Sequence, residues 1–172
     1  MKLWTIQKVE FYEQLIKDKI LYNDKKYIMS GSFQYAYDYM KKCMQDRKNI
    51  QLKDSQNPIF AWQMYDGECK KPDLRRKNHT NKGQKSVCLE LEVPDELALL
   101  SNFDYWHLCL NLSEMISENE GLKLDKSVLE KFKIYDESEL FDVQNDEVLF
   151  VQACIPFIKI DFVKKVQFFT GK

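Results

Sequence analysis

Two glutamates, Glu90 and Glu92, stand two positions apart in the segment VCLELEV. In a β-strand such residues point to the same face, about 7 Å apart by strand rise. Two carboxylates in different surroundings can divide into a general acid and a general base. Charged residues that alternate with Val and Leu are also typical of a solvent-facing strand. The pattern therefore favours a solvated face and keeps a catalytic pair as the alternative.

The two histidines offer a second kind of chemistry. His107 follows Trp106 in FDYWHLCLN, and on a helix it shares a face with Asp104 and Asn111, which can orient its imidazole. The alternative that we favour is a histidine at the rim of the core, hydrogen-bonded to Asp104. His79 lies among basic residues, which disfavour its protonation. No Ser or Cys stands in register with either histidine, so the sequence gives no support to a nucleophile–base pair.

A cationic segment, residues 70–85 (KKPDLRRKNHTNKGQK), holds seven basic residues and one acidic residue. Arg75 follows Asp73 at a spacing that lets the pair clamp each other. Alternatively, Arg75 can fork onto a phosphate or a carboxylate. The phosphate-cradling pattern GxxxxGK[ST] is missing, and the segment has no aromatic residue on which a base could stack. With a pI of about 6.2, these features argue against general nucleic-acid binding.

The five cysteines are odd in number and contain no CxxC or CxxxC pair. We expect free, mostly buried thiols and, with only two histidines to help, no metal site. The amino-terminal residues interrupt their apolar side chains with charges, and no apolar run reaches the ~20 residues of a spanning helix. The chain is predicted to be a cytoplasmic protein without a membrane segment, folded as one domain over residues 1–172.

The periodicity of the apolar residues predicts the elements that position these side chains. Helices are expected over roughly residues 8–22, from Ser32 onward, and over 103–112, 127–132 and 138–141. Strands are expected over residues 3–6, 59–65, 86–93, 97–100, 148–153 and 165–170. Helices early and strands late favour an α+β fold with a mixed, largely antiparallel sheet over a doubly wound parallel one.

Five segments together resemble a bacterial family, the domain of unknown function 3841. They are MKLWTIQ, SFQYAYDYM, PIFAWQ with KPDLRR, LELEVPDELALLSNFDYWHLCLN and VQACIPFIKIDFVKKVQFF. The likeness extends over nearly the whole chain. It implies no established reaction, substrate or cofactor.

The layout is also similar, more distantly, to that of small ADP-ribosyltransferase-like domains. This resemblance implies a split sheet, NAD as the ligand and transfer of ADP-ribose. In that family the first strand carries a His or Arg, a middle element supplies a Ser or Tyr, and a late strand supplies a Glu or Gln. The resemblance places residues 3–7 in the first motif, Ser32, Tyr35 or Tyr37 in the second, and Gln152 in the third.

The candidate residues that follow are Gln152, Glu90 and His107 for catalysis, and Trp4, Thr5, Tyr37 and Arg75 for the cofactor. Arg75 would meet a phosphate, and Trp4 or Tyr37 would stack on the nicotinamide ring. Two departures stand out. Thr5 occupies the place of the His or Arg, and Gln152 is neutral where a fixed carboxylate would stabilise an oxocarbenium-like charge. Either another carboxylate such as Glu90 serves the cleft, or the fold is present and transfer is absent.

Two other functions remain open. The first is a non-catalytic module that binds a protein or a peptide in an aromatic cleft lined by tryptophans. The second is a small RNA-cleaving, toxin-like protein with His107 or His79 beside the cationic segment. The nucleotide hypothesis depends on a spatial expectation: the opening strand, the cationic segment and the strand of Gln152 should meet around a common hollow. The oligomeric state is left undetermined.

Overall fold

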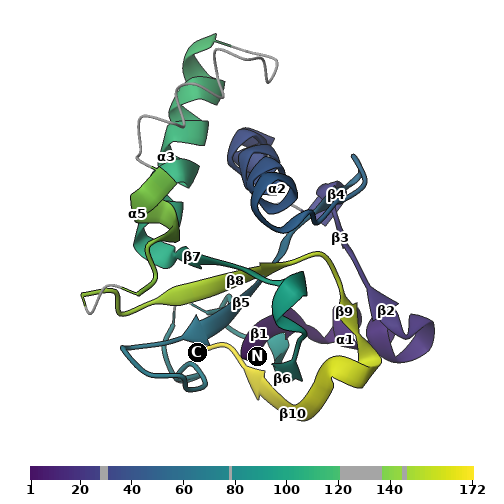
Figure 1. The fold of residues 1–172 in the computed structure, drawn as a ribbon. Helices are drawn as coiled ribbons and strands as arrows, with labels where there is room; N and C mark the ends of the chain where they lie inside the picture. The colour runs from purple at the N-terminus through teal and green to yellow at the C-terminus, as the bar shows by residue number, and fades with distance from the viewer. Residues whose placement is uncertain (28–30, 78, 121–136, 145–146) are drawn as a thin grey trace.

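The computed structural model describes residues 1–27, 31–77, 79–120, 137–144 and 147–172 (Figure 1). Its strands are β1 (Lys2–Lys8), β2 (Ile20–Leu21), β3 (Asn23–Asp24), β4 (Gln56–Asn57), β5 (Ile59–Met64), β6 (Lys85–Glu92), β7 (Leu99–Asn102), β8 (Val151–Ile155), β9 (Ile158–Lys159) and β10 (Val163–Thr170). Its α-helices are α1 (Val9–Asp18), α2 (Gln34–Lys48), α3 (Phe103–Glu120) and α5 (Glu137–Phe141). Short 3-10 helices are η1 (Lys25–Tyr27), η2 (Gly31–Phe33), η3 (Asp95–Leu97) and η4 (Ile160–Phe162).

One six-stranded sheet organises the chain, in the order β10-β6-β1-β5-β8-β7. Its strand pairs are all antiparallel within the described residues. Two small two-stranded sheets, β2-β9 and β3-β4, lie outside it. The predicted α+β class with a largely antiparallel sheet is therefore confirmed.

Several predicted bounds change. The first helix ends at Asp18 rather than near residue 22, because Lys19 adopts a left-handed conformation (φ 63°) and its N–H donates to the Leu15 carbonyl. The next residues, Ile20–Leu21, then pair with β9. The central helix begins at Phe103 as predicted but continues well past residue 112. The predicted helix over 127–132 lies outside the described residues.

Helices cover the two faces of the sheet unequally. In Figure 1, α2 and α3 stand side by side on one face, whereas α1 lies beside the β1 and β6 part of the sheet. The core under α2 and α3 contains Ala36, Tyr39, Met40, Met44, Leu99, Trp106, Cys109 and Cys154. The core on the other face contains Leu3, Leu15, Ile59, Ala61, Leu89, Leu91, Ala153 and Ile155. The sheet is thus the shared wall of two apolar clusters.

The predicted alternation of buried and exposed side chains along β6 is only partly observed. Leu89 and Leu91 are fully buried, but Cys88 on the opposite face is buried as well. On that face the Glu90 side chain is 17% exposed and the Glu92 side chain is 71% exposed. Because β6 lies between β1 and β10, its polar face is partly covered by neighbouring side chains. The two carboxylates therefore share a face without sharing an environment.

The junction between the two halves of the sheet is narrow. β1 pairs with β6 from Lys2 to Lys8, whereas its register with β5 comprises Trp4 and Trp62. Beyond this pair, the Thr5 Oγ1 hydroxyl donates to the Phe60 backbone carbonyl at 3.0 Å. Next to their one register pair, a side-chain hydrogen bond therefore adds a second link between the two strands.

The prediction of free, mostly buried thiols is confirmed: Cys69 is exposed and the other four cysteines are buried. Burial raises the pKa of Cys88 to about 11 and that of Cys109 to about 12. In the described ranges, no group of three or more His, Cys, Asp or Glu side chains is placed to hold a metal ion. None of the helices described there has the length and apolar character needed to cross a membrane.

Leu89→Ala should destabilise the fold by about 2–5 kcal/mol, because it removes a fully buried side chain and leaves a cavity in the core. Urea denaturation followed by circular dichroism measures this loss. Glu92→Gln on the same strand is the matched control, with an expected change within about 0.5 kcal/mol because its ion pair with Lys164 is exposed. Equal losses for the two variants would contradict the assignment of the faces.

Candidate ligand-binding site

An aromatic hollow of about 310 Å³ opens where β1 and β5 separate. Its lining residues are Ile6, Gln7, Phe11, Leu21, Tyr22, Asn23, Tyr27, Tyr37, Ile59 and Phe60. Among the described residues, those that line this hollow carry aromatic rings and two carboxamides but no formal charge. We call it the aromatic hollow.

The walls of the aromatic hollow come from two directions. Tyr37 of α2 packs edge-on against Phe60, with ring centroids 5.5 Å apart. On the other side, Phe11 of α1 packs edge-on against Tyr27, with centroids 4.8 Å apart. Burial is the main cause that raises the pKa of Tyr37, so its hydroxyl stays protonated and can donate a hydrogen bond. A flat ring placed between these walls would meet aromatic edges on both sides.

Two amide side chains are fixed at this hollow. Gln7 Nε2 donates to Thr5 Oγ1 at 2.8 Å, and Asn23 Nδ2 donates to the Pro58 carbonyl at 2.9 Å. Thr5 is buried and uses its own proton on Phe60. Thr5 thus positions Gln7 rather than lining the hollow itself.

A basic hollow of about 530 Å³ adjoins the aromatic one. Its lining residues are Ile6, Gln7, Lys8, Phe11, Lys77, His79, Thr80, Asn81, Gln84 and Ser86. The two hollows share Ile6, Gln7 and Phe11. Thr80 Oγ1 and Ser86 Oγ are buried and have no hydrogen-bond partner among the described residues. Such hydroxyls are rare in folded proteins and call for a partner.

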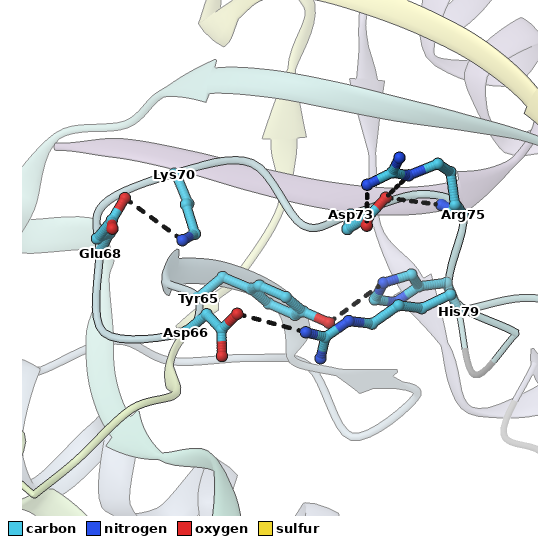
Figure 2. Close-up of polar contacts among 8 residues, drawn as sticks. Tyr65, Asp66, Glu68, Lys70, Asp73, Arg75 and His79 are labelled. Carbon is cyan, nitrogen blue, oxygen red and sulfur yellow. Dashed lines mark hydrogen bonds and ion pairs between the residues drawn. The ribbon is translucent and has the colours of Figure 1, made fainter.

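Carboxylates within and just before the cationic segment pair with three of its seven basic residues. Arg75 binds Asp73 through two side-chain hydrogen bonds of 2.8 Å, and its side chain is 80% exposed (Figure 2). This pair holds the pKa of the Asp73 carboxyl well below its usual range. Glu68 and Lys70 form another ion pair, 3.3 Å apart. Of the two alternatives for Arg75, the structure shows the clamp with Asp73.

His79 belongs to the same segment. Its Nε2 is 3.5 Å from the Tyr65 hydroxyl (Figure 2). Arg76 contacts the Tyr65 ring, 5.3 Å from the centroid, and pairs with Asp66 at 3.3 Å. Burial first, and then the charge of Arg76, lower the pKa of His79. The imidazole is therefore held neutral near pH 7, on the border of the basic hollow.

His107 and Gln152 share a third hollow of about 200 Å³, which we call the His107–Gln152 hollow. Its other lining residues are Phe60, Ala61, Trp62, Phe103 and Trp106. His107 is exposed at its rim. Because Phe60 lines both this hollow and the aromatic one, its ring forms a wall between them.

Trp4 and Glu90 line a fourth hollow, of about 460 Å³, together with Lys71, Cys88, Lys165, Val166 and Gln167. Trp4 Nε1 donates to Glu90 Oε2 at 3.3 Å. Lys2 and Lys165 lie 3.5 and 3.7 Å from Glu90 Oε1. The Glu90 carboxylate is thus already compensated from three sides. Glu92 lines none of these hollows, so the two glutamates do not form a pair around one cavity.

The predicted site residues are divided among separate places. The opening strand and the cationic segment do meet around a hollow, the basic one, through Gln7, Lys8 and Lys77. Gln152 lies in the same six-stranded sheet but lines a different hollow, so the expectation of one common hollow does not hold for it. Arg75 is absent from the linings of all the hollows described above.

Sequence reasoning missed Gln7, Tyr22, Asn23, Tyr27 and Lys77 as lining residues. Gln7 had a usable signal, because residues two apart on a strand share a face and Thr5 was already a candidate. Tyr27 lies in a 3-10 turn and Asn23 in a two-residue strand. Elements this short leave no periodicity to read.

Residues 2–152 match the family described as Domain of unknown function (DUF3841). The predicted resemblance to that family is therefore confirmed. No curated protein and no solved structure matches the chain.

His79 should make the folded state sensitive to acid. Its pKa is lower in the folded protein than in the unfolded chain, so its contribution to stability is complete above about pH 6.5 and is lost as the pH falls through the folded-state pKa. Urea denaturation at about pH 7.5 and about pH 5.5 should show a smaller loss of stability for His79→Gln than for the wild-type chain. Equal losses would contradict the buried, neutral imidazole.

Proposed function

We propose that the chain, which belongs to the family of domains of unknown function DUF3841, binds a dinucleotide of the NAD class across the aromatic and basic hollows. One observation carries the proposal. Gln7 lies where an uncharged aromatic hollow meets a hollow with lysines and unpartnered hydroxyls. A dinucleotide of this class presents the matching order of groups: a flat ring with a carboxamide, ribose hydroxyls and then phosphates.

The aromatic hollow suits the nicotinamide ring. Tyr37, Phe60 and Tyr27 offer ring faces and edges, and a positively charged ring is also attracted to the faces of aromatic side chains. The carboxamide of the ligand both donates and accepts, as do the side-chain amides of Gln7 and Asn23. With Nε2 of Gln7 tied to Thr5, its Oε1 is oriented before a ligand arrives, which lowers the entropic cost of binding.

The basic hollow suits the phosphates and a ribose. Lys8 and Lys77 supply positive charge, and lysine acts as a point charge toward phosphate. Thr80 and Ser86 supply hydroxyl donors that lack a partner among the described residues. Arg75 would not take the phosphate role that the family resemblance implied, because Asp73 already occupies its guanidinium.

The proposal concerns recognition of the dinucleotide. Among the described residues, no carboxylate lines either hollow. Stabilising the charge that develops when the nicotinamide–ribose bond breaks would need a carboxylate close to that ribose. Glu90 is held by Trp4 and two lysines in another hollow. Binding of NAD without ADP-ribosyl transfer is therefore the function that this arrangement supports best.

Isothermal titration of NAD⁺ into the full chain should show saturable binding. Gln7→Ala should weaken it at least tenfold, or about 1.4 kcal/mol, because the amide at the meeting point of the hollows is lost. Lys77→Ala should weaken it less and should reduce its dependence on salt, because one phosphate contact is removed.

Arg75→Ala is the matched control, a change of charge in the same segment that should leave the affinity unchanged. Circular dichroism of each variant verifies that it folds. No binding by the folded wild-type chain at millimolar NAD⁺, or wild-type affinity in Gln7→Ala, would refute the proposal.

A further inference from the structure

The His107–Gln152 hollow contains a buried polar group without a partner. Gln152 is 3% exposed, and its Nε2 has no hydrogen-bond partner among the described residues. A buried amide that cannot reach water destabilises the folded state unless another group satisfies it. Since Gln152 lines the hollow, a ligand that displaces its side chain slightly and reaches Nε2 there would supply an acceptor.

Aromatic side chains form the sides of this hollow. Trp62 and Phe103 lie with ring centroids 4.6 Å apart, and Phe103 lies 4.4 Å from His107. On the other side, Phe60 and Trp106 stack at 5.0 Å with an angle of 30° between their planes. A flat ring can enter between these two groups and contact both. The volume of about 200 Å³ is below the usual range of sites for larger ligands, so we expect one ring rather than two.

The elements that carry these side chains are regular secondary structure. Phe103, Trp106 and His107 lie in the first two turns of α3, which Asn102 caps by accepting from the Asp104 N–H at 3.0 Å. Trp62 and Gln152 are direct partners on adjacent strands, so they point to the same face of the sheet. The hollow is therefore formed before any ligand arrives.

We infer that this hollow binds an uncharged, single-ring heterocycle with an exocyclic carbonyl, which is the chemistry of a pyrimidine base. The ring of the ligand stacks between two pairs of aromatic side chains, Trp62 with Phe103 and Phe60 with Trp106. Its carbonyl oxygen accepts a hydrogen bond from Gln152 Nε2. His107, exposed at the rim, contacts the sugar side of the ligand. This site is separate from the NAD site, because the stacked rings of Phe60 and Trp106 lie between the His107–Gln152 hollow and Tyr37. It does not depend on the proposed binding of NAD.

Uridine is the probe, titrated into the full chain by calorimetry. We expect saturable binding that Gln152→Leu weakens at least tenfold, because the leucine fills the same space without a donor. Gln152→Leu should also raise the melting temperature, since it removes a buried amide that has no partner in the free protein. Adenosine should bind at least fivefold more weakly than uridine, because its two-ring base exceeds the space.

Crossed variants separate this site from the NAD site. Gln7→Ala should leave uridine binding unchanged, and Gln152→Leu should leave NAD⁺ binding unchanged, so either proposal can fail alone. A short oligouridylate that binds much more tightly than uridine identifies the source of the base as a strand, and equal affinity identifies a free nucleoside; both results support a base site. Absence of uridine binding at millimolar concentration, wild-type affinity in folded Gln152→Leu, or equal binding of adenosine would overturn the inference.

Discussion

The pairing of Trp4 with Trp62 is the constraint on which the arrangement of the hollows depends. It joins β10-β6-β1 to β5-β8-β7 within one sheet. Because side chains alternate along a strand, a slip of one residue at this junction would move every side chain of one half to the opposite face. Thr5 and Phe60 then hold the strands together by a side-chain hydrogen bond where the ladder stops. The aromatic hollow lies beside this junction, lined by Ile6 and Gln7 of β1 and by Ile59 and Phe60 of β5.

The same registers place a row of side chains on one face, across all six strands. The row is Lys165, Glu90, Trp4, Trp62, Gln152 and Ser101. The helices α2 and α3 cover only the β5-β8-β7 half of this face (Figure 1). Glu90 lies outside that cover, where Lys2 and Lys165 can reach it.

Because α2 and α3 cover Gln152 but not Glu90, there is a physical reason for a neutral residue at position 152. Gln152 lies beneath the aromatic side chains of α3 and is almost fully buried. A carboxylate there would be buried with no lysine or arginine among the residues of its hollow, and an uncompensated buried charge is very costly. An amide keeps a hydrogen-bonding group in the hollow at a much smaller cost. The departure from a catalytic Glu thus fits a site that recognises rather than cleaves.

Local sequence patterns predicted the elements well but not the way they assemble. The alternation in β6 and the apolar stripe of α2 follow from short-range periodicity; β6 occurs near its predicted bounds, and α2 begins near its predicted start. The hydrogen bond from Trp4 to Glu90 joins residues 86 positions apart, and no local pattern encodes such a pairing. Glu90 and Glu92 were correctly placed on one face, whereas their different exposures depend on β10 beside them. Tyr37 lines one hollow and His107 and Gln152 another, a division that depends on how α2 and α3 pack on the sheet and that no local pattern encodes.

The cationic segment shows why composition alone misassigns a binding role. Its excess of positive charge suggested a phosphate ligand for Arg75, because a guanidinium can donate two parallel hydrogen bonds to a phosphate. Asp73, two positions earlier, accepts both hydrogen bonds of the Arg75 guanidinium, and Asp66, just before the segment, pairs with Arg76. Of the basic residues of the segment, Lys77 lines the basic hollow, together with Lys8 of β1 and the residues that carry the buried hydroxyls. A phosphate in the basic hollow would therefore meet lysine rather than arginine, because both arginines of the segment are already paired with carboxylates.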